Sequence, residues 1–460
     1  MLRNNLILKS DSYKYSHTHL YPPGTTAMES YGCSRGGKYP AITFFGMQYL
    51  IKEYFSKKIS VADVEEANEV LTKHGVPFDR DGWTYIAKDL GGKLPMKIRA
   101  VKEGTTVPNH NILWKAESTD PRVFWLESWA ETKLVQLWYP CTTATKSREI
   151  KKVIMKYLQL SSDDPAGEIL FKLHSFGYRG VTSDEQAGIG DMAHLINFMG
   201  TDTLPGVTFA RDYYGEDLSG YSIPATEHST ITSWTRAGEA KAYSNFLDQF
   251  GGKYPLIACV SDSYDIYNAI TNLWGGELKS KVVNCGSTLI CRPDSGDPPT
   301  MVRDCLKLLD AAFGSVLNTK GYKVLNNVRV IQGDGVNQAS IGEILELATN
   351  EGYSATNIAF GSGGDLLQSH NRDTNKFAVK CSSITVSGQD FEVTKDPITD
   401  QGKRSLGGSL DLIQDANGTY QTIKVRPGQV ADGSLLQTVF ENGELVNETT
   451  FAEIRARAAL

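Results

Sequence analysis

The sequence predicts an α/β fold, either a closed or nearly closed parallel barrel or a doubly wound sheet. After Thr142, seven short apolar runs each end in a polar turn, and helical patterns follow these turns. The spacing of the runs is close to the roughly 30 residues of a strand–helix–strand unit. In either fold the turns meet at one face, where such proteins carry their chemistry. The runs and their turns occupy residues 173–180, 199–203, 221–228, 260–265, 290–297, 330–335 and 358–364.

The two ends of the chain differ from this middle part, because strand patterns dominate there. Residues 94–101 alternate as a half-buried strand does, whereas residues 396–408 are polar and are expected to form a mobile loop. Further strands are predicted at 28–33, 41–45, 377–382, 391–394, 420–425 and 437–441. We therefore expect two domains. Residues 141–376 form the barrel that carries the active site, and residues 1–140 with 377–460 form a sheet-rich α/β domain.

Capping residues mark several helices. Asp297 followed by Pro298 predicts a helix start, since Asp caps the first turn and Pro fits inside it. Asp120 begins another predicted helix for the same reason, and that helix is expected to end near Pro140. A third helix is expected over 231–250.

Composition narrows the function. The 460 residues carry a net charge of -6 with no block of like charges, so nucleic-acid binding is not expected as the main task. No apolar stretch approaches the length of a membrane span, and the amino end lacks a signal-peptide core. The seven cysteines form no C-x-x-C pair, which is typical of reduced thiols. These features predict a cytoplasmic protein without a membrane or nucleic-acid partner.

The turn at 221–228 is the most informative stretch. An apolar run stops at Pro224, Glu227 and His228 follow, and hydroxyl residues then open a helix. Because helix amino ends favour anions, His228 suits an anion-handling enzyme; the alternative is a capping turn whose histidine only forms hydrogen bonds. The other histidines show no metal spacing, and His174 among them is expected only to form hydrogen bonds.

Other turns also have two interpretations. The glycines of 361–364 and 332–335 fit a phosphate cradle, where backbone N–H groups approach the ligand, or simply a tight turn. Residues 292–297 combine an arginine with two carboxylates, which suits a phosphate with bound Mg²⁺ or else a surface ion pair. Asp202 is either a helix cap or a recognition group.

Taken together and in order, these motifs resemble the nicotinamide phosphoribosyltransferases of the nicotinate/nicotinamide phosphoribosyltransferase family. The resemblance runs from about residue 4 to the end of the chain. The motifs that carry it are DSYK at 11–14, YPP at 21–23, LHSFGYRG at 173–180, GTDT at 200–203, EHSTIT at 227–232, SDSYDIYN at 261–268, RPDSG at 292–296, QGDG at 332–335 and FGSGG at 360–364.

The resemblance implies an irregular α/β barrel of the type II phosphoribosyltransferase kind, with a second α/β domain built from both chain ends. It also implies a homodimer whose active sites are shared between the subunits. The implied reaction transfers the phosphoribosyl group of 5-phosphoribosyl 1-pyrophosphate to nicotinamide, giving nicotinamide mononucleotide and pyrophosphate for NAD biosynthesis. The implied cofactor is Mg²⁺, and ATP is a coupled co-substrate that phosphorylates His228.

The same resemblance assigns residues to sites. The pyridine ring stacks between Phe176 and Tyr13 of the partner subunit, and Asp202 accepts a hydrogen bond from the amide. Glu227 and Asp265 support His228. Arg179, Ser222 and Ser261 complete the nicotinamide pocket. The ribose and phosphates are held by Arg292, Asp294, Gly333, Asp334, Gly363, Gly364, Arg372, Lys380 and Lys395, and Asp294 is the candidate metal ligand.

Two departures from the family pattern stand out. Asp365 follows the glycines where a small residue is expected, and its charge near a phosphate site puts that contact, or the use of metal, in question. The loop at 33–38 is shorter than in vertebrate members, so no contact is carried over to it.

Three rival functions remain. A nicotinate phosphoribosyltransferase is disfavoured, since the carboxylate of Asp202 repels an acid substrate. A non-catalytic protein that binds phosphate sugars has no need of Glu227 and His228. An aldolase-type barrel requires a Schiff-base lysine at a strand end, and Lys380 is the candidate for it.

Overall fold

The computed structural model describes residues 5–400 and 403–460, and the chain folds as two compact units. One unit comprises Met1–Thr145, Arg211–Glu216 and His370–Ala459. The other comprises Lys146–Ala210 and Asp217–Ser369, together with Leu460. No sequence pattern indicated that residues 211–216 belong with the two chain ends.

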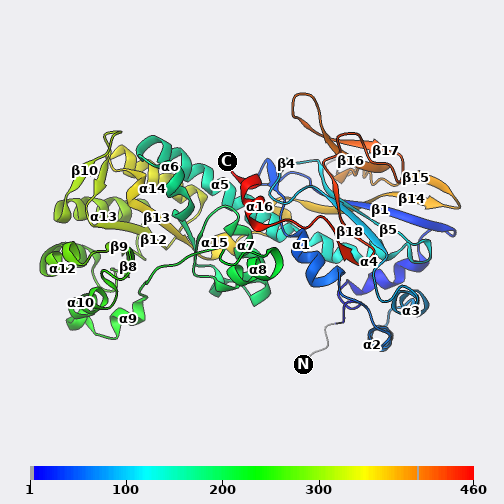
Figure 1. The fold of residues 1–460 in the computed structure, drawn as a ribbon, viewed down its shortest axis with the longest axis horizontal. Coiled ribbons are helices and arrows are strands. Elements are labelled where there is room, and N and C mark those ends of the chain that lie inside the picture. The colour runs from blue at the N-terminus through cyan, green and yellow to red at the C-terminus, as the bar shows by residue number, and fades with distance from the viewer. Residues whose placement is uncertain (1–4, 401–402) are drawn as a thin grey trace. The chain divides into compact units, whose positions relative to one another are not determined.

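The first unit is organised around a seven-stranded sheet to which both chain ends contribute. β1 (Thr25–Ser34) pairs antiparallel with β14 (Phe377–Val386) and β5 (Ile112–Ser118), and Figure 1 shows these blue, orange and cyan strands in one sheet. The full order is β15 (Gln389–Glu392), β14, β1, β5, β3 (Met96–Ala100), β18 (Gln437–Glu441) and β19 (Glu444–Leu445). Two small sheets pair β2 (Ala41–Thr43) with β4 (Thr106–Pro108) and β16 (Ser409–Gln414) with β17 (Tyr420–Val425).

Several helices of this unit begin at capping side chains. Ser60 and Asp63 form a capping box at the start of α2, and Thr450 and Glu453 form another at the start of α16. Large buried rings such as Trp83 fill the core of the unit. The helices are η1 (Ser12–His19), α1 (Met47–Leu50), η2 (Ile51–Phe55), α2 (Val61–His74), α3 (Arg80–Lys88), η3 (Pro121–Val123), α4 (Leu126–Val135), η9 (Arg372–Thr374) and α16 (Phe451–Ala458).

The second unit contains a six-stranded parallel sheet that an irregular seventh segment closes into a ring. The order is β7 (Gly200–Thr201), β6 (Leu173–Ser175), β13 (Ile358–Ser362), β12 (Val328–Gln332), β9 (Thr288–Arg292) and β8 (Leu256–Val260). Single parallel bridges join Tyr221 to Gly200 on β7 and Ala225 to Ala258 on β8. Residues 221–225 therefore connect the two edge strands, and the predicted parallel barrel with seven strand-to-turn units is confirmed.

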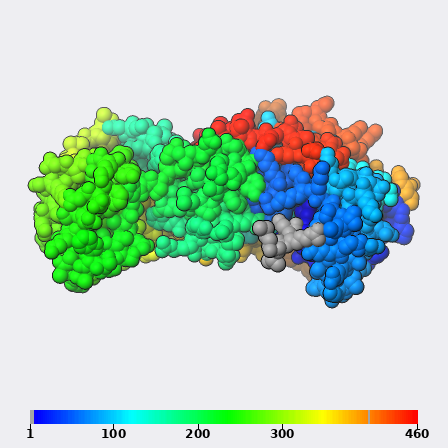
Figure 2. Space-filling view, turned by 60° about the horizontal axis from the view of Figure 1, so that its bottom comes forward, coloured from blue at the N-terminus to red at the C-terminus, as the bar shows by residue number. Residues whose placement is uncertain are grey.

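Helices surround this ring, and their apolar sides pack into one core with the strands. Figure 1 shows α13 and α14 beside β12 and β13, and α9 to α12 lie on the green surface in Figure 2. Two helices cross between the units: α5 (Trp138–Ser161) belongs to this unit from Lys146 on, and α8 (Leu204–Tyr214) belongs to it up to Ala210. The other helices are α6 (Pro165–Glu168), η4 (Ile169–Phe171), η5 (Tyr178–Gly180), α7 (Asp184–Leu195), α9 (His228–Thr232), η6 (Arg236–Gly238), α10 (Glu239–Phe250), α11 (Ile266–Asn268), η7 (Ala269–Glu277), α12 (Lys279–Asn284), α13 (Pro298–Phe313), α14 (Gln338–Asn350), η8 (Ala355–Asn357) and α15 (Gly364–Leu367). A hairpin pairs β10 (Ser315–Leu317) with β11 (Lys323–Leu325).

Two helix predictions need correction. The helix expected over 231–250 is broken, because Thr235 adopts φ 62° between α9 and α10. The helix expected to end near Pro140 ends earlier, and α5 begins at Trp138 with Pro140 in its first turn, where a missing N–H costs nothing. The prediction at Asp297 is confirmed, since its carboxylate accepts from Thr300 N at 3.1 Å.

In the expected loop at 396–408, residues 401–402 lie outside the described residues, and β16 directly after the loop was not predicted. Among the residues that the structure describes, no helix is long and apolar enough to cross a membrane.

Candidate active site

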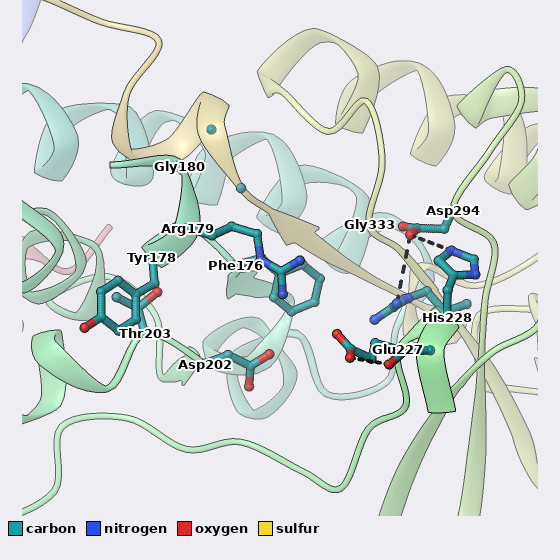
Figure 3. Close-up of a pocket in the computed structure, with 14 residues that line it drawn as sticks. Phe176, Tyr178, Arg179, Gly180, Asp202, Thr203, Glu227, His228, Asp294 and Gly333 are labelled. Carbon is teal, nitrogen blue, oxygen red and sulfur yellow. Dashed lines mark hydrogen bonds and ion pairs between the residues drawn. The ribbon is translucent and has the colours of Figure 1, made fainter. Parts of the chain in front are cut away.

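A cavity of about 950 Å³ opens where the strands of the barrel unit end. Figure 3 shows its lining side chains converging from successive strand ends. The turn after β6 supplies four of them, and the turns after β7, β9, β12, β13 and the segment 221–225 supply the rest. The lining residues are Phe176, Tyr178, Arg179, Gly180, Asp202, Thr203, Glu227, His228, Ser229, Arg292, Asp294, Gly333, Gly363 and Gly364. Most of the predicted site residues of this unit thus share one cavity.

Asp202 is held in place by two neighbours. His174 Nε2 lies 3.0 Å from Asp202 Oδ1, and the Ser222 hydroxyl donates a hydrogen bond to the same oxygen. Burial works to raise the pKa of Asp202, but His174, Ser222 and the charge of Arg292 together hold it below its ordinary value. Asp202 is therefore an anion beside the cavity. The role of His174 was missed in the sequence, although it lies on β6 two residues before Phe176 and its ring contacts the Phe176 ring, with centroids 5.2 Å apart.

Phe176 supplies the flat apolar wall of the cavity, and a glycine makes room for its ring. A Cβ at Gly361 would lie 2.0 Å from Phe176 Cε2, so no larger residue fits there without moving the ring. In Figure 3, Arg179 extends toward Phe176, and Asp202 lies below the ring in this view. The glycine run at 361–364 thus has a packing role in addition to any contact with phosphate.

His228 lies among carboxylates in the same cavity. Its Nε2 is 3.3 Å from Asp294 Oδ2 and 3.8 Å from Asp262 Oδ1, and its Nδ1 is 3.4 Å from Ser263 Oγ. Asp262 is nearly buried and accepts from Asp294 N at 2.9 Å, so it fixes the turn after β9. Sequence reasoning did not single out Asp262, although it lies in the motif at 261–268.

The two residues expected to support His228 form their hydrogen bonds with other residues. Asp265 caps α11, where its Oδ1 accepts from Asn268 N at 3.0 Å. Glu227 lines the cavity but accepts from Ser229 Oγ at 2.5 Å. The carboxylates that the structure brings to His228 are therefore Asp294 and Asp262.

Two further predicted residues of this unit stand behind or beside the cavity. Ser261 is fully buried and accepts from Trp274 Nε1 at 3.1 Å, while Asp334 is exposed in the turn after β12. Asp365 is paired with Lys146, whose Nζ lies 2.8 Å from Asp365 Oδ2. Neither Asp334 nor Asp365 lines the cavity.

Four predicted residues belong to the first unit. Tyr13 is 57% exposed, and Arg372 and Lys395 are also exposed. Lys380 is half-buried on β14, and desolvation lowers its pKa. These residues are available to a second chain or to an incoming ligand.

The cavity offers few protein side chains that could bind a metal ion. Within the described part of the chain, no cluster of three His, Cys, Asp or Glu side chains could hold a metal ion. Asp294 lines the cavity, and the nearly buried Asp262 contacts its backbone N–H, so one cavity carboxylate is present, which fits Mg²⁺ that is bound mainly through substrate phosphates and water.

Comparisons with known proteins agree with this geometry. The model of the nicotinate phosphoribosyltransferase (NAPRTase) family matches residues 171–444, and that of the nicotinamide phosphoribosyltransferase N-terminal domain matches residues 5–98. A protein of Xanthomonas campestris named nicotinamide phosphoribosyltransferase is 51% identical over 99% of this chain and 98% of its own length. One of Acinetobacter baylyi with the same name is 28% identical over 99% of this chain and 97% of its own.

Two solved structures share the fold. Nicotinate-nucleotide pyrophosphorylase from Pyrococcus furiosus matches with a TM-score of 0.64 at 16% identity, over 100% of this chain and 96% of that one. Human nicotinic acid phosphoribosyltransferase matches with a TM-score of 0.61 at 16% identity, over 98% of this chain and 92% of that one. The full-length sequence match, the two family models and the barrel with its cavity lead to one conclusion: this chain belongs to the nicotinate phosphoribosyltransferase family.

Proposed function

We propose that this protein is a nicotinamide phosphoribosyltransferase, which joins nicotinamide to 5-phosphoribosyl 1-pyrophosphate and releases pyrophosphate. The observation that carries the proposal is the anionic Asp202 beside Phe176. Within the described part of the chain, His174 and Ser222 both contact Oδ1, which leaves Oδ2 to accept a hydrogen bond from the amide of nicotinamide. The carboxylate of nicotinate would instead be repelled. The name of the 51% identical relative, nicotinamide phosphoribosyltransferase, supports the same substrate.

The transfer step needs charge stabilisation on both sides of the ribosyl carbon. As the pyrophosphate leaves, positive charge develops on the sugar, and fixed carboxylates near it lower the barrier. Arg292, Gly363 and Gly364 line the cavity, and the guanidinium of Arg292 and the backbone N–H groups of the two glycines would hold the phosphate oxygens. A Mg²⁺ ion bound with the pyrophosphate would neutralise leaving-group charge, and Asp294 is the residue to hold it or its waters.

ATP coupling is a further part of the proposal. The imidazole of His228 attacks the γ-phosphorus of ATP, the bond to the β-phosphate oxygen breaks, and ADP leaves with that bond's electron pair. Asp294 and Asp262 hold the ring through the contacts given above and offset the positive charge that develops on it. The phosphohistidine then lies beside the pyrophosphate site, where its hydrolysis can draw the transfer toward the mononucleotide.

The proposed functional unit is a homodimer. Tyr13 of the partner subunit would close the second face of the pyridine ring, opposite Phe176. Arg372, Lys380 and Lys395 would add positive charge near the phosphates, some of them from the partner subunit. The exposure of Tyr13, Arg372 and Lys395 supports this arrangement.

One assay tests the proposal. Purified protein is incubated with nicotinamide, phosphoribosyl pyrophosphate and Mg²⁺, with and without ATP, and the mononucleotide is quantified by chromatography. We expect product without ATP and a lower apparent KM for nicotinamide with ATP. Nicotinate serves as the parallel substrate; no product from nicotinamide, or equal kcat/KM for both substrates, would contradict the proposal.

A further inference from the structure

An ion pair between a buried lysine and a partly exposed aspartate lies next to the glycine turn of the cavity. Lys146, on α5, is 3% exposed in its side chain, and its Nζ lies 2.8 Å from Asp365 Oδ2. The same ammonium group donates to the carbonyl oxygen of Asp365 and to Ser369 Oγ at 3.1 Å. Ser369 Oγ also donates to Asp365 Oδ1 at 2.6 Å. One lysine thus holds Asp365 in α15 and Ser369, which lies two residues beyond the end of this helix.

The short helix α15 depends on these contacts for its position. It has four residues, too few to be stable alone, and its backbone closes through Gln368 N and Ser369 N to the carbonyl oxygen of Gly364, at 2.9 and 3.0 Å. Gly363 and Gly364, which line the cavity, come immediately before Asp365 in the chain. A movement of Asp365 therefore moves the backbone N–H groups of the two glycines.

The charge of the pair matters as much as its geometry. A carboxylate one residue beyond a phosphate site repels the ligand, and a buried ammonium within salt-bridge distance cancels most of that field. A lysine left buried without an opposite charge is destabilising, so each partner requires the other. The negative charge that set this sequence apart from its family pattern is thus matched by a positive charge from a helix far away in the sequence.

We infer that Lys146 and Asp365 are a pair of positioning residues for the pyrophosphate-bearing substrate, which fix the turn at Gly363 and Gly364 and keep the Asp365 charge off the ligand. This inference rests on the proposed function, because it names the phosphate-binding turn of that same site. Neither residue lines the cavity, so neither contacts substrate or reacting atoms.

Four variants test the pair: Lys146→Met, Asp365→Asn, the double variant, and Lys115→Met as the control. Lys115 is equally buried and pairs with Glu29 at 2.9 Å in the first unit, away from the glycine turn. Lys146→Met leaves Asp365 unpaired behind the phosphates, so KM for phosphoribosyl pyrophosphate rises about tenfold or more, while KM for nicotinamide changes less than about twofold. In the double variant the repulsive charge is gone, and KM returns to within about threefold of wild type.

The readouts are steady-state kinetics, binding of phosphoribosyl pyrophosphate with Mg²⁺ by calorimetry, and Tm for each variant. A purely structural pair would lower Tm alike in Lys146→Met and Lys115→Met and leave both KM values unchanged, which would overturn the inference. A double variant no better than Lys146→Met would overturn it as well. If Lys146→Met does not fold, the other two variants still test the inference. A KM for phosphoribosyl pyrophosphate equal to wild type in Asp365→Asn would contradict the positioning role. A wild-type protein that makes no mononucleotide refutes the proposed function instead, so the two failures are distinguishable.

Discussion

At the scale of single residues, the proposed choice of substrate depends on one carboxylate, Asp202, whose charge is held by its neighbours. Asp202 is kept ionised by His174 and Ser222, which both contact Oδ1. An ionised acceptor selects an amide NH₂ over a carboxylate, because the wrong substrate brings repulsion and donates no hydrogen bond to the acceptor oxygen.

We predict that Asp202→Asn loses most of the discrimination between nicotinamide and nicotinate. The expected loss is about 10²-fold or more in the ratio of the two kcat/KM values, since the repulsive charge disappears. Ser222→Ala is the matched control: it removes one hydrogen bond and keeps the charge, so the ratio should fall less than about tenfold. Unchanged selectivity in Asp202→Asn would remove this residue from substrate recognition.

The contacts of His228 lead to a second residue prediction. His228→Ala should abolish the effect of ATP on KM for nicotinamide while basal transfer persists. Asp262→Asn should weaken the ATP effect, because Asp262 lies 3.8 Å from Nε2 and fixes the turn of Asp294. Asp265→Asn should retain the effect, since Asp265 caps α11 instead. Phosphate incorporation from labelled ATP checks all three, and labelling of His228→Ala would refute the assignment.

At the scale of elements, the strand ends could be predicted, but the contacts between them could not. Apolar runs that end in polar turns located every strand of the parallel sheet in the barrel unit, because each run must be buried and each turn exposed. The hairpin of β10 and β11 was not predicted. The pairings of His174 with Asp202 and of Lys146 with Asp365 join separate turns or helices, and only the packed fold brings them together. The broken helix at Thr235 was missed because its apolar pattern continues through the break.

The turn after β13 gives an element-scale prediction. Gly361→Ala places a Cβ 2.0 Å from the Phe176 ring, so the ring must move and KM for nicotinamide should rise about tenfold or more. Gly342→Ala in α14 is the control, because the nearest atom to its Cβ is 3.7 Å away and alanine favours a helix. Kinetics and Tm of both variants check this; equal KM values would show that the ring position does not matter.

At the scale of the whole molecule, buried acids set the response of stability to pH. Burial raises the pKa of Asp191 in the barrel unit to about 7 and that of Glu127 in the first unit to about 7. At pH values between the ordinary pKa of each group and about 7, the native state binds more protons at these two groups than the unfolded chain does. These two groups therefore lower stability as pH rises through that interval.

We predict that Asp191→Asn and Glu127→Gln each flatten the fall in stability between pH 5 and pH 8. The difference from wild type at pH 8 should reach roughly 2–4 kcal/mol per site, because an amide carries no ionisation cost. Urea unfolding at several pH values measures it. Curves that keep the wild-type slope would show that these carboxyls do not titrate in this range.

The fold class and most of the cavity could be predicted at this scale, since motif order and strand spacing are properties of the chain itself. Residues 211–216 belong with the two chain ends, and this could not be predicted, because they continue a helix of the barrel unit. Asp365 was recognised as unusual, but its partner is a lysine more than 200 residues earlier, at 146.

The two single bridges that hold residues 221–225 have a dynamic consequence. Because few backbone hydrogen bonds join residues 221–225 to the two edge strands, the free energy of local opening is lower here than in the ladders between the other strands. We expect the amide protons of Thr201, Tyr221 and Thr226 to exchange with solvent before those of β9 and β12. Residues 221–225 position Ser222 and lead into Glu227 and His228, so a ligand bound in the cavity should slow the exchange of these amide protons. Local opening of the barrel at this segment and ligand binding are then thermodynamically linked.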